Sequence, residues 1–443
     1  MDKERRDIQP MIVKHNLTIL PKGYPLFKWM PSLALAECLT LATILISTVL
    51  FKRLGVSNDF ITYYTAWLYL PWAVRPIVQR LMPPTLHSRG TIVTIEILIT
   101  ITILCIAFSL SARANVQTIV GLLGIIGLCG VMHSIESDRL YDKVSSHNRY
   151  SRIHGFWYTI AFFMAMSICH GLTVTFAGNM EVLTRTIRHS WSVAFYILGA
   201  FYGALAILHA FTLAKPDKRP LQFCDMTEES RSLRKVTVAF FSKKQGILIA
   251  TFLILYLLPE GLLNQVSALF IIDARHNGGL GLSPAEYGLL VGTIGMIGIT
   301  GGGLIGGKLI TKNGLRHWLW PMTCAMTLPN AIYLYLSYDM TTDFFIICIC
   351  IFIRHLMLGF GLSAYVTFLI RSNKCGINLS HYSICATFIA LPLMIPSWYS
   401  GTIQEDYGFR TFFLIAFAAG ILTFIASLLL TIAENTLHDD IYK

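Results

Sequence analysis

The sequence is short of charge. Only 13% of its 443 residues are Asp, Glu, Lys or Arg, whereas 54% are hydrophobic and the mean hydropathy is +0.60. A soluble domain of ordinary composition carries about twice that share of charge. Apolar stretches of about 20 residues recur along the chain, and a helix of that length spans the hydrocarbon core of a bilayer. The composition excludes a soluble globular protein and predicts an all-α polytopic membrane protein.

Motifs that would indicate other chemistry are also absent. No Walker sequence GxxxxGK[ST] occurs, so any ATP drive would have to come from another chain. The ten cysteines form no CxxC pair or Cys/His set, and we therefore expect no metal site and no cofactor. The net charge of +11 is spread over short connections between apolar runs, which argues against a nucleic-acid partner.

One polar stretch, residues 215–245, interrupts the apolar runs near the middle of the chain. It is rich in Lys and Arg, and basic connections stay on the cytoplasmic side of a membrane. We expect a cytoplasmic connector here, between six-helix bundles over 26–214 and 246–433. Residues 1–25 and 434–443 would then form a cytoplasmic N-terminal arm and tail.

Twelve apolar segments are predicted to span the membrane: 26–51, 60–81, 91–112, 116–135, 153–176, 191–214, 246–272, 285–310, 317–337, 343–370, 380–402 and 409–433. With the N-terminus inside, 26 of the 35 Lys and Arg residues fall on the cytoplasmic side and seven on the other. This bias predicts that both termini are cytoplasmic.

The two halves share short matches. Leu54-Gly55-Val56-Ser57 follows the first span and Leu280-Gly281-Leu282-Ser283 follows the seventh, with Ser57 and Ser283 placed as N-caps of the next helix. Glu37 and Glu260 lie in those same two spans. The matches favour a six-plus-six duplication, the plan of the major facilitator superfamily.

The stretch over 301–317, GGGLIGGKLITKNGLRH, resembles the loop signature of that superfamily, without its usual acidic residue. Glycines let two helices approach closely, and the basic residues then end the span at the cytoplasmic face. The resemblance implies a gating role for Lys312 and Arg316.

A narrower likeness rests on several motifs: Arg53–Asn58, Tyr64–Trp72, Arg75-Pro76, Gly278–Ser283, Trp318–Met322 and Ser380–Ser383. They resemble the muropeptide-permease (AmpG-like) branch, in the forms seen in Bacteroidetes. The resemblance implies a proton-coupled symporter of the bacterial inner membrane that imports an amino-sugar-containing or muropeptide-like solute and works as a monomer among membrane lipids. The chain departs from the branch at Cys38 and Thr40, at Arg75 where lysine is usual, and at Ser134 where an acidic residue is usual.

Two carboxylates are candidates for proton coupling. Glu37 lies about 16 Å along its span, from the helical rise per residue, and Glu260 follows Pro259 in the seventh span. A charge at such depth is costly unless it is paired, protonated or in a watery cavity. Each residue either faces the cavity or serves as a structural hydrogen-bonding group between helices.

Two arginines and several polar or aromatic residues could contact solute. Arg75 and Arg354, with His355 beside the latter, either bind an anionic group or form internal ion pairs, with Glu37 as a partner for Arg75. Asn264 and Gln265 extend the polar stripe of Glu260. Trp67, Tyr69 and Trp72 either stack on a sugar ring or pack between helices.

The remaining candidates are a latch and four histidines. Asp138-Arg139, at the end of the fourth span, is predicted to be a conformational latch. His133, His154, His170 and His209 are interpreted as packing residues with satisfied hydrogen bonds.

Other functions stay open. The chain could be a facilitator for another sugar or organic anion, or a transporter-like sensor without flux. A membrane enzyme would need an acidic catalytic loop outside, and the longest predicted external loop, 177–190, is short. We therefore expect a permease rather than an enzyme.

Overall fold

The computed structural model describes residues 26–82, 88–144, 149–213, 237–238, 240–241, 244–374 and 379–437. Within these ranges every regular element is a helix, which confirms the predicted all-α class. The predicted arm over 1–25, most of the connector over 215–245 and the end of the tail over 434–443 lie outside the described residues.

The helices fall into two sets in chain order. The first, here called the N-terminal half, contains α1 (Leu26–Leu45), α2 (Ser47–Arg53), α3 (Asn58–Trp67), α4 (Leu70–Ala73), α5 (Arg75–Leu81), α6 (Ser88–Ser111), α7 (Val116–Val144), α8 (Arg149–Met166), η1 (Ser167–Thr173), α9 (Val174–Thr184) and α10 (Ile187–Thr212). The second, the C-terminal half, contains α12 (Lys244–Ile272), η3 (Arg275–Asn277), α13 (Pro284–Leu289), η4 (Leu290–Gly295), α14 (Met296–Asn313), α15 (Leu315–Thr327), η5 (Leu328–Asn330), α16 (Ala331–Asp339), α17 (Phe344–Lys374), α18 (Leu379–Ala419) and α19 (Ile421–Leu437).

Nine helices in the described ranges are long and apolar enough to cross a membrane, so the chain is a multi-pass membrane protein. Two predicted spans are instead divided. The span near 60–81 breaks into α3, α4 and α5, and the span near 317–337 breaks at η5. Prolines lie at these breaks, Pro71 and Pro76 in the first and Pro329 in the second, because proline cannot donate the backbone hydrogen bond of a continuing helix. The last two predicted spans meet at Gly408, whose φ of 75° interrupts α18.

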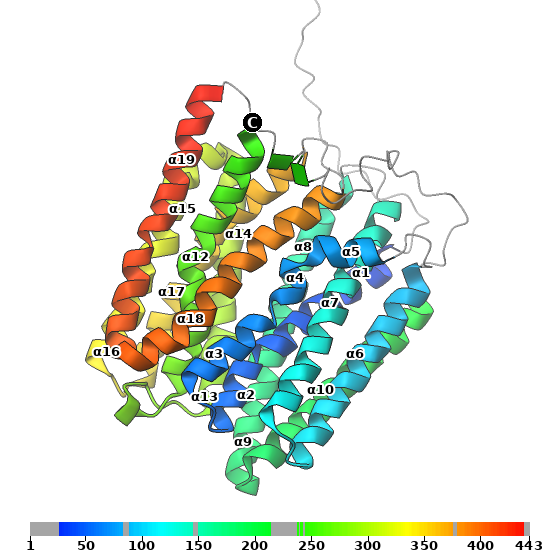
Figure 1. Cartoon of the computed structure of the whole chain (residues 1–443), viewed down its shortest axis with the longest axis vertical. Coiled ribbons are helices and arrows are strands. Elements are labelled where there is room, and N and C mark those ends of the chain that lie inside the picture. Colours follow the sequence, from blue (N-terminus) through cyan, green and yellow to red (C-terminus); the bar gives the residue numbers. More distant parts are fainter. Residues whose placement is uncertain are drawn as a thin grey trace, which may run out of the picture.

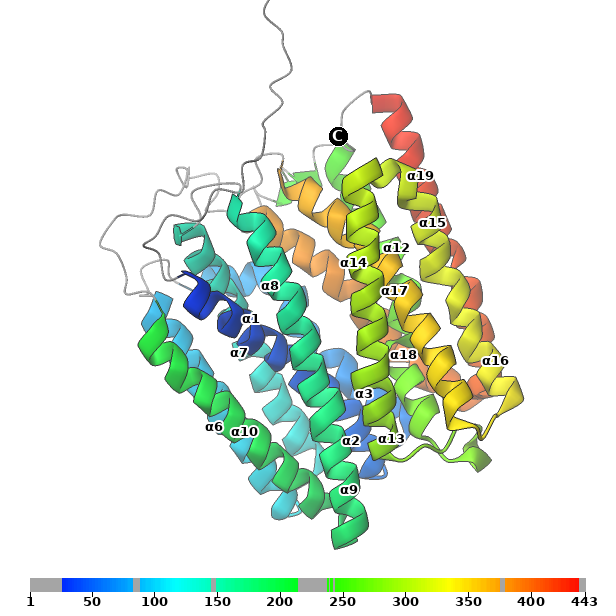
Figure 2. The same cartoon turned by 180° about the vertical axis from the view of Figure 1, so that it is seen from behind.

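The two halves lie side by side (Figures 1 and 2). α18 packs along α3, α4 and α5, and α13 packs against α9, so each half presents helical segments to the other. α1 and α12 begin, and α10 and α19 end, at the upper side of Figure 1, here called the terminus face. The turns after α2 and η3 lie at the other side, here called the opposite face.

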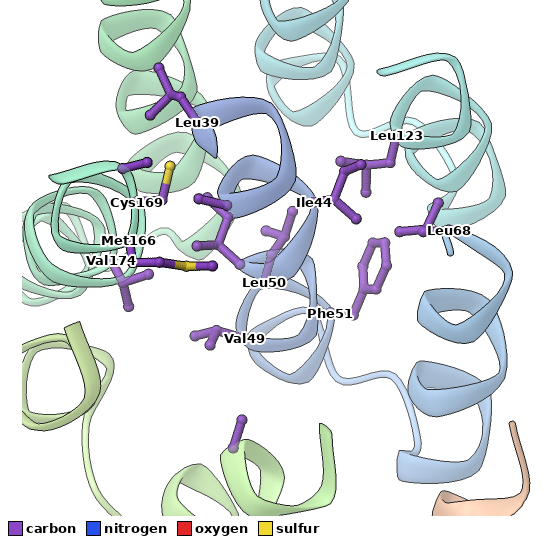
Figure 3. Packing of buried hydrophobic residues seen from close by; sticks show 14 of the residues in the cluster. Leu39, Ile44, Val49, Leu50, Phe51, Leu68, Leu123, Met166, Cys169 and Val174 are labelled. Atoms are coloured by element: carbon purple, nitrogen blue, oxygen red, sulfur yellow. The ribbon is translucent and has the colours of Figure 1, made fainter. Parts of the chain in front are cut away.

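α1 lies at the centre of the N-terminal half. The span over Trp29–Arg53 is the most buried of the nine, at 78%. Figure 3 shows its apolar side chains packed in two directions, toward α3 and α7 on one side and toward α8, η1 and α9 on the other. The fully buried residues in this cluster include Leu39, Val49, Leu50, Phe51, Leu123, Cys169 and Val174. Because this helix is enclosed on both sides, it has little freedom to move independently of its half.

Two π-helical segments cross at the boundary between the halves. η1 interrupts the fifth span and η4 the eighth, and the two contact each other. A Cβ atom on Gly292 would lie 2.0 Å from the backbone nitrogen of Gly171, so glycine is required for this approach. Wider π turns inside an α-helix often mark functional positions.

The structure changes two details of the expected helix ends. α9 continues to Thr184, so the predicted external loop over 177–190 shrinks to a tight turn at Arg185, which has a φ of 53°. Ser283 caps α13 in a reciprocal capping box with Glu286. Ser57 also stands at an N-cap, but its hydroxyl donates to the Asp59 carboxylate instead of accepting from the backbone.

Candidate functional site

A buried arginine forms an ion pair inside the N-terminal half. Arg75 is 4% exposed and begins α5, directly after the break at Val74. Its Nη2 donates to Asp138 Oδ2 at 2.5 Å and its Nη1 to Ser134 Oγ at 2.9 Å. Ser134 and Asp138 lie one turn apart on α7, so both face the guanidinium. The acidic partner of Arg75 is thus Asp138, whereas the sequence suggested Glu37.

A second buried pair lies inside the C-terminal half. Arg354 Nη2 on α17 donates to Glu260 Oε2 on α12 at 2.6 Å, and Asn330 Nδ2 lies 3.3 Å from Glu260 Oε1. The guanidinium also lies over the Tyr333 ring, 5.3 Å from its centroid. Breaking such a pair by removing one partner typically costs about 3 to 5 kcal/mol, because the other charge stays buried. Glu260 is therefore held as a charged partner of Arg354.

Glu37 occupies a different environment. It is half-buried on α1, and Tyr158 from α8 donates to its Oε1 at 3.4 Å. This contact is longer than the one between Arg354 and Glu260, and it involves no opposite charge. Of the two predicted coupling residues, Glu37 has the less constrained carboxyl.

Several predicted solute contacts lie at the boundary between the halves. Asn264 Nδ2 on α12 donates to the Tyr69 hydroxyl at 2.7 Å. The ring of Trp67 packs edge-on against Trp398 of α18, with centroids 4.6 Å apart. Trp72 is half-buried and lies close to Gly130 on α7. Trp67 and Asn264 thus join the two halves in this conformation.

Gln265 and His355 are buried in the C-terminal half. Gln265 is 3% exposed, and its Oε1 has no hydrogen-bond partner among the described residues. His355 Nδ1 donates to the Ile351 carbonyl at 2.8 Å, which leaves its Nε2 as an acceptor. The ring rests against Gly295 of η4, where a Cβ atom would lie 3.1 Å away.

The predicted gating residues fall into two groups. Arg139 bonds Glu136 at 2.5 Å and the carbonyls of Gln79 and Met82, so it fastens α7 to α5 within the N-terminal half. Lys312 and Arg316 are exposed where α14 ends and α15 begins, at the terminus face. The structure brings Asp138 to Arg75, while its neighbour Arg139 points to different partners.

A polar network that joins the halves at the opposite face was not predicted. Lys52 Nζ lies 2.7 Å from Asp273 Oδ2, and Asn58 Nδ2 lies 3.1 Å from the same oxygen. Asn58 also donates to Gln404 Oε1 at 2.6 Å and, through its backbone nitrogen, to Glu405 Oε1 at 2.7 Å. The network links α2 and α3 with α12 and α18, so it closes the boundary between the halves at this face.

The charge of Asp273 is stabilised in this network. Burial alone would raise the pKa of its carboxyl, but hydrogen bonds from Lys52, Asn277 and Asn58, with the charge of Lys52, outweigh burial and lower that pKa below 3.8. A lowered pKa keeps the carboxylate charged at neutral pH. Lys52 and Asp273 therefore form an ion pair at neutral pH.

A neighbouring ion pair stays within the N-terminal half. Arg53 Nη2 donates to Glu181 Oε2 at 2.6 Å, and Trp191 Nε1 donates to Glu181 Oε1 at 2.7 Å. Consecutive basic residues thus point to different halves, Lys52 across the boundary and Arg53 back to α9. The only sequence signal for either pair was the Lys52-Arg53 doublet ahead of the first Leu-Gly-Val-Ser motif.

The structure also collects titratable groups that sequence reasoning had separated. His133 and His209, interpreted as packing residues, both contact Glu96 of α6, which was overlooked inside an apolar span. His170 lies against the Tyr287 hydroxyl at 3.5 Å, across the boundary between the halves. The side chain of His154 lies outside the described residues. Within the described ranges no group of three or more His, Cys, Asp or Glu side chains could hold a metal ion.

Comparisons with known proteins agree with this architecture. The chain is 23% identical over 373 residues to the anhydromuropeptide permease of Escherichia coli (strain K12), covering 82% of this chain and 70% of the relative. Its structure resembles the nucleoside transporter NupG, with a TM-score of 0.64, 15% identity and coverage of 92% and 99%. It also resembles a D-xylose-proton symporter, with a TM-score of 0.65, 11% identity and coverage of 91% and 95%. No protein-family model matches the chain.

Two helical halves joined by polar contacts, with charged pairs buried in each, give the chain the fold of these solved transporters. Over most of its length the sequence is similar to that of the Escherichia coli permease.

Proposed function

We propose that this chain is a proton-coupled importer of an anhydromuropeptide or a related amino-sugar solute in the bacterial inner membrane. The support is the likeness to a permease named for that solute, over most of both chains. The structural likeness to a proton symporter supports the coupling ion.

The proposed topology has twelve spans in two bundles, 26–214 and 246–433, with both termini and the connector cytoplasmic. Twelve spans result if α3 to α5 count as one, α15 to α16 count as one, and the chain reverses at Gly408. The terminus face is then cytoplasmic and the opposite face external. The excess of Lys and Arg on the terminus side supports this orientation.

The observation that carries the proposal is the polar network between the halves at the opposite face. Lys52 and Asn58 belong to one half, and Asp273 and Gln404 to the other. Hydrogen bonds of this kind can exchange with water, so the halves can separate here without exposing an apolar core. With this face closed, solute exchanges from the terminus face. Alternation of the two closures would carry solute through the membrane.

Arg75 is the proposed anchor for an anionic group of the solute. Its guanidinium cannot deprotonate, and its fork matches a carboxylate. In the closed structure Asp138 and Ser134 occupy that fork. A solute carboxylate would replace Asp138, which would weaken the contact between α5 and α7 as the solute binds. Trp72, Trp67, Asn264, Gln265, Arg354 and His355 are proposed as the remaining contacts.

Glu37 is the preferred coupling residue and Glu260 the second candidate. Glu260 is held by Arg354 at 2.6 Å, so a proton on Glu260 would have to displace a buried ion pair. The contact that Tyr158 makes with the Glu37 carboxyl is longer, at 3.4 Å, and involves no opposite charge.

The experiment uses purified protein in proteoliposomes and a radiolabelled anhydromuropeptide. We expect an inward-directed proton gradient to drive accumulation by the wild type. Glu37→Gln should abolish gradient-driven accumulation while counterflow between equal pools survives, because glutamine keeps the shape but cannot titrate. The Glu286→Gln variant, which alters an exposed capping residue, is the control for the loss of a carboxylate.

Three results would redirect the proposal. Binding without flux would indicate a sensor. Flux of a free sugar or another organic anion, but not of the muropeptide, would indicate a different permease. Full accumulation in both Glu37→Gln and Glu260→Gln would show that neither carboxyl carries the coupling proton.

A further inference from the structure

Three titratable side chains meet in the core of the N-terminal half, apart from the residues proposed above. Glu96 comes from α6, His133 from α7 and His209 from α10, and each is 0% exposed. Glu96 Oε1 lies 3.0 Å from His133 Nε2 and 2.7 Å from His209 Nδ1. One carboxylate oxygen therefore accepts from two imidazoles, and both facing nitrogens must carry hydrogen.

The far nitrogen of His209 determines how many protons the cluster holds. His209 Nε2 lies 2.9 Å from Ser32 Oγ, and Ser32 Oγ lies 3.0 Å from the Trp29 carbonyl oxygen. A serine hydroxyl has a single hydrogen. When Ser32 donates it to Trp29, His209 must donate through both nitrogens and is an imidazolium. When Ser32 donates to His209 instead, that ring is neutral.

The same heavy-atom positions thus fit two states that differ by one proton. The Nδ1 of His133 faces the hydroxyl of Ser137 at 3.4 Å, and in both states we take that hydroxyl as the donor. The cluster is neutral overall with the extra proton and carries one negative charge without it. A buried net charge is costly in the membrane, so the protonated state suits the closed, dry core. The deprotonated state needs access to water.

The charged or titratable groups that face the cluster come from α1, α7 and α10. The groups that act on the charge of Glu96 are His133 of α7 and His209 of α10. The Tyr202 hydroxyl of α10 also lies within electrostatic range of Glu96, and Glu37 of α1 and Cys129 of α7 act on Tyr202 in turn. Glu96 Oε2 is buried and has no hydrogen-bond partner among the described residues. A metal ion is disfavoured, because two N–H groups point at the oxygen it would share.

Tyr202, on the same helix as His209, contacts α1. Its hydroxyl lies 2.8 Å from Thr40 Oγ1 and 3.2 Å from the Ala36 carbonyl oxygen. Glu37 lies between these two positions in the chain and is half-buried. The Tyr202 and Thr40 hydroxyls therefore contact each other next to a helical turn that carries a partly accessible carboxyl.

We propose that Glu96, His133 and His209 form a proton-binding site that takes up and releases one proton at His209, with Tyr202 and Thr40 positioned between it and Glu37. The site itself stands on its geometry, and its part in the transport cycle rests on the proposed function. Because α1 and α10 belong to the same half, separation of the halves would act through the access of water to Glu37, and so would change the affinity for the proton.

The first test counts protons and needs no solute. Detergent-purified protein is titrated from about pH 8 to pH 5.5, the range over which histidine changes charge. We expect the wild type to bind about one proton per molecule more than Glu96→Gln, because without the carboxylate a buried imidazolium is uncompensated. His170→Gln is the matched control, since it removes an imidazole of the same half whose hydrogen-bond contact is a tyrosine. Equal proton uptake by the wild type and Glu96→Gln overturns the proposal.

A second measurement covers the case in which Glu96→Gln does not fold. The wild type is labelled with ¹⁵N at its imidazoles, and the His209 resonances are assigned through His209→Gln. We expect them to change from neutral imidazole to imidazolium over the same pH range. Resonances that stay at one form throughout overturn the proposal.

Transport distinguishes failure of this site from failure of the proposed function. If the titration holds and no anhydromuropeptide is carried, the proton site stands and the proposed solute is wrong. If Glu96→Gln is folded, shows full gradient-driven accumulation and binds as many protons as the wild type, the site is wrong and the proposed function stands.

Discussion

At the scale of single residues, the molecule buries its charges in pairs. Arg75 with Asp138, and Arg354 with Glu260, place two guanidinium groups where an unpaired charge would be very costly. In the proposed function, a solute carboxylate that binds Arg75 would compete with Asp138, which already contacts the guanidinium. Solute binding would then depend on Asp138 as much as on Arg75.

Substitutions at Arg75 should separate binding from stability. Arg75→Gln leaves Asp138 without its guanidinium, and we expect a loss of about 3 to 5 kcal/mol in unfolding free energy. The double variant Arg75→Gln with Asp138→Asn should recover most of that loss, since no charge is left unpaired. Thermal unfolding in detergent measures both variants.

Binding should not recover in the same way. We expect both variants to lose affinity for acidic solutes far more than for neutral analogues, with Arg75→Lys intermediate because lysine keeps the charge but lacks the fork. Isothermal titration measures these affinities. Equal losses for acidic and neutral solutes would assign Arg75 a structural role only.

At the scale of elements, the boundary between the halves relies on close backbone approach. η1 and η4 meet through Gly171 and Gly292, where no side chain fits. The polar network around Asp273 lies near the end of the same boundary. Glycine contacts set how closely the helices can approach, and the network joins the halves at the opposite face.

Gly292→Ala should hinder closure at the opposite face, because its Cβ would lie 2.0 Å from Gly171 N. Spin labels at Asn115 and Thr342, exposed on different halves, should show a longer distance between them in double electron–electron resonance. Gly307→Ala is the matched control, since a Cβ there has no neighbour within 4 Å. Unchanged distances in Gly292→Ala would contradict the steric argument.

Closure through Asp273 should not depend on pH near neutrality. Because the pKa of Asp273 is lowered, its carboxylate stabilises the closed network at pH values above that pKa. This stabilisation is lost only as the pH falls through the lowered pKa, below 3.8. Asp273→Asn should lengthen the Asn115–Thr342 distance, because Lys52 loses its charged partner. The difference between this variant and the wild type should stay constant between about pH 5 and pH 8. A difference that shrinks between those pH values would place a proton-sensitive group in the network.

At the scale of the whole molecule, orientation is the property to test. In a cysteine-free background, cysteines at Pro220 and Asn435 should resist an impermeant thiol reagent in intact cells, because the connector and the C-terminal tail are proposed to be cytoplasmic. A cysteine at Thr186, exposed in the turn before α10, should react. Gly178, which the sequence placed in an external loop, is unsuitable because it packs against Ala285 of the other half. Labelling at Pro220 from outside would reverse the orientation.

The positions of the helices could be read from the sequence, because a span needs only length and apolar content. Partners between distant segments could not. The sequence alone could not identify Glu96 as part of a polar cluster. The two histidines that it contacts are 37 and 113 residues away, and only the fold brings them near. Asp273 looked like an ordinary loop residue for the same reason. The π segments leave no periodic pattern that differs from an α-helix, so η1 and η4 were read as regular helix.

The opposite directions of Lys52 and Arg53 have a consequence for how solute is captured. Arg53 stays bound to Glu181 of its own half when the halves part, so it holds the end of α2 in place while Lys52 loses Asp273. The opening between the halves at this face then has the unpaired positive charge of Lys52 on the N-terminal half. An anionic solute would be drawn to it over about a Debye length, roughly 10 Å at 0.1 M salt. The rate of capture, but not the rate of crossing, should therefore fall as ionic strength rises.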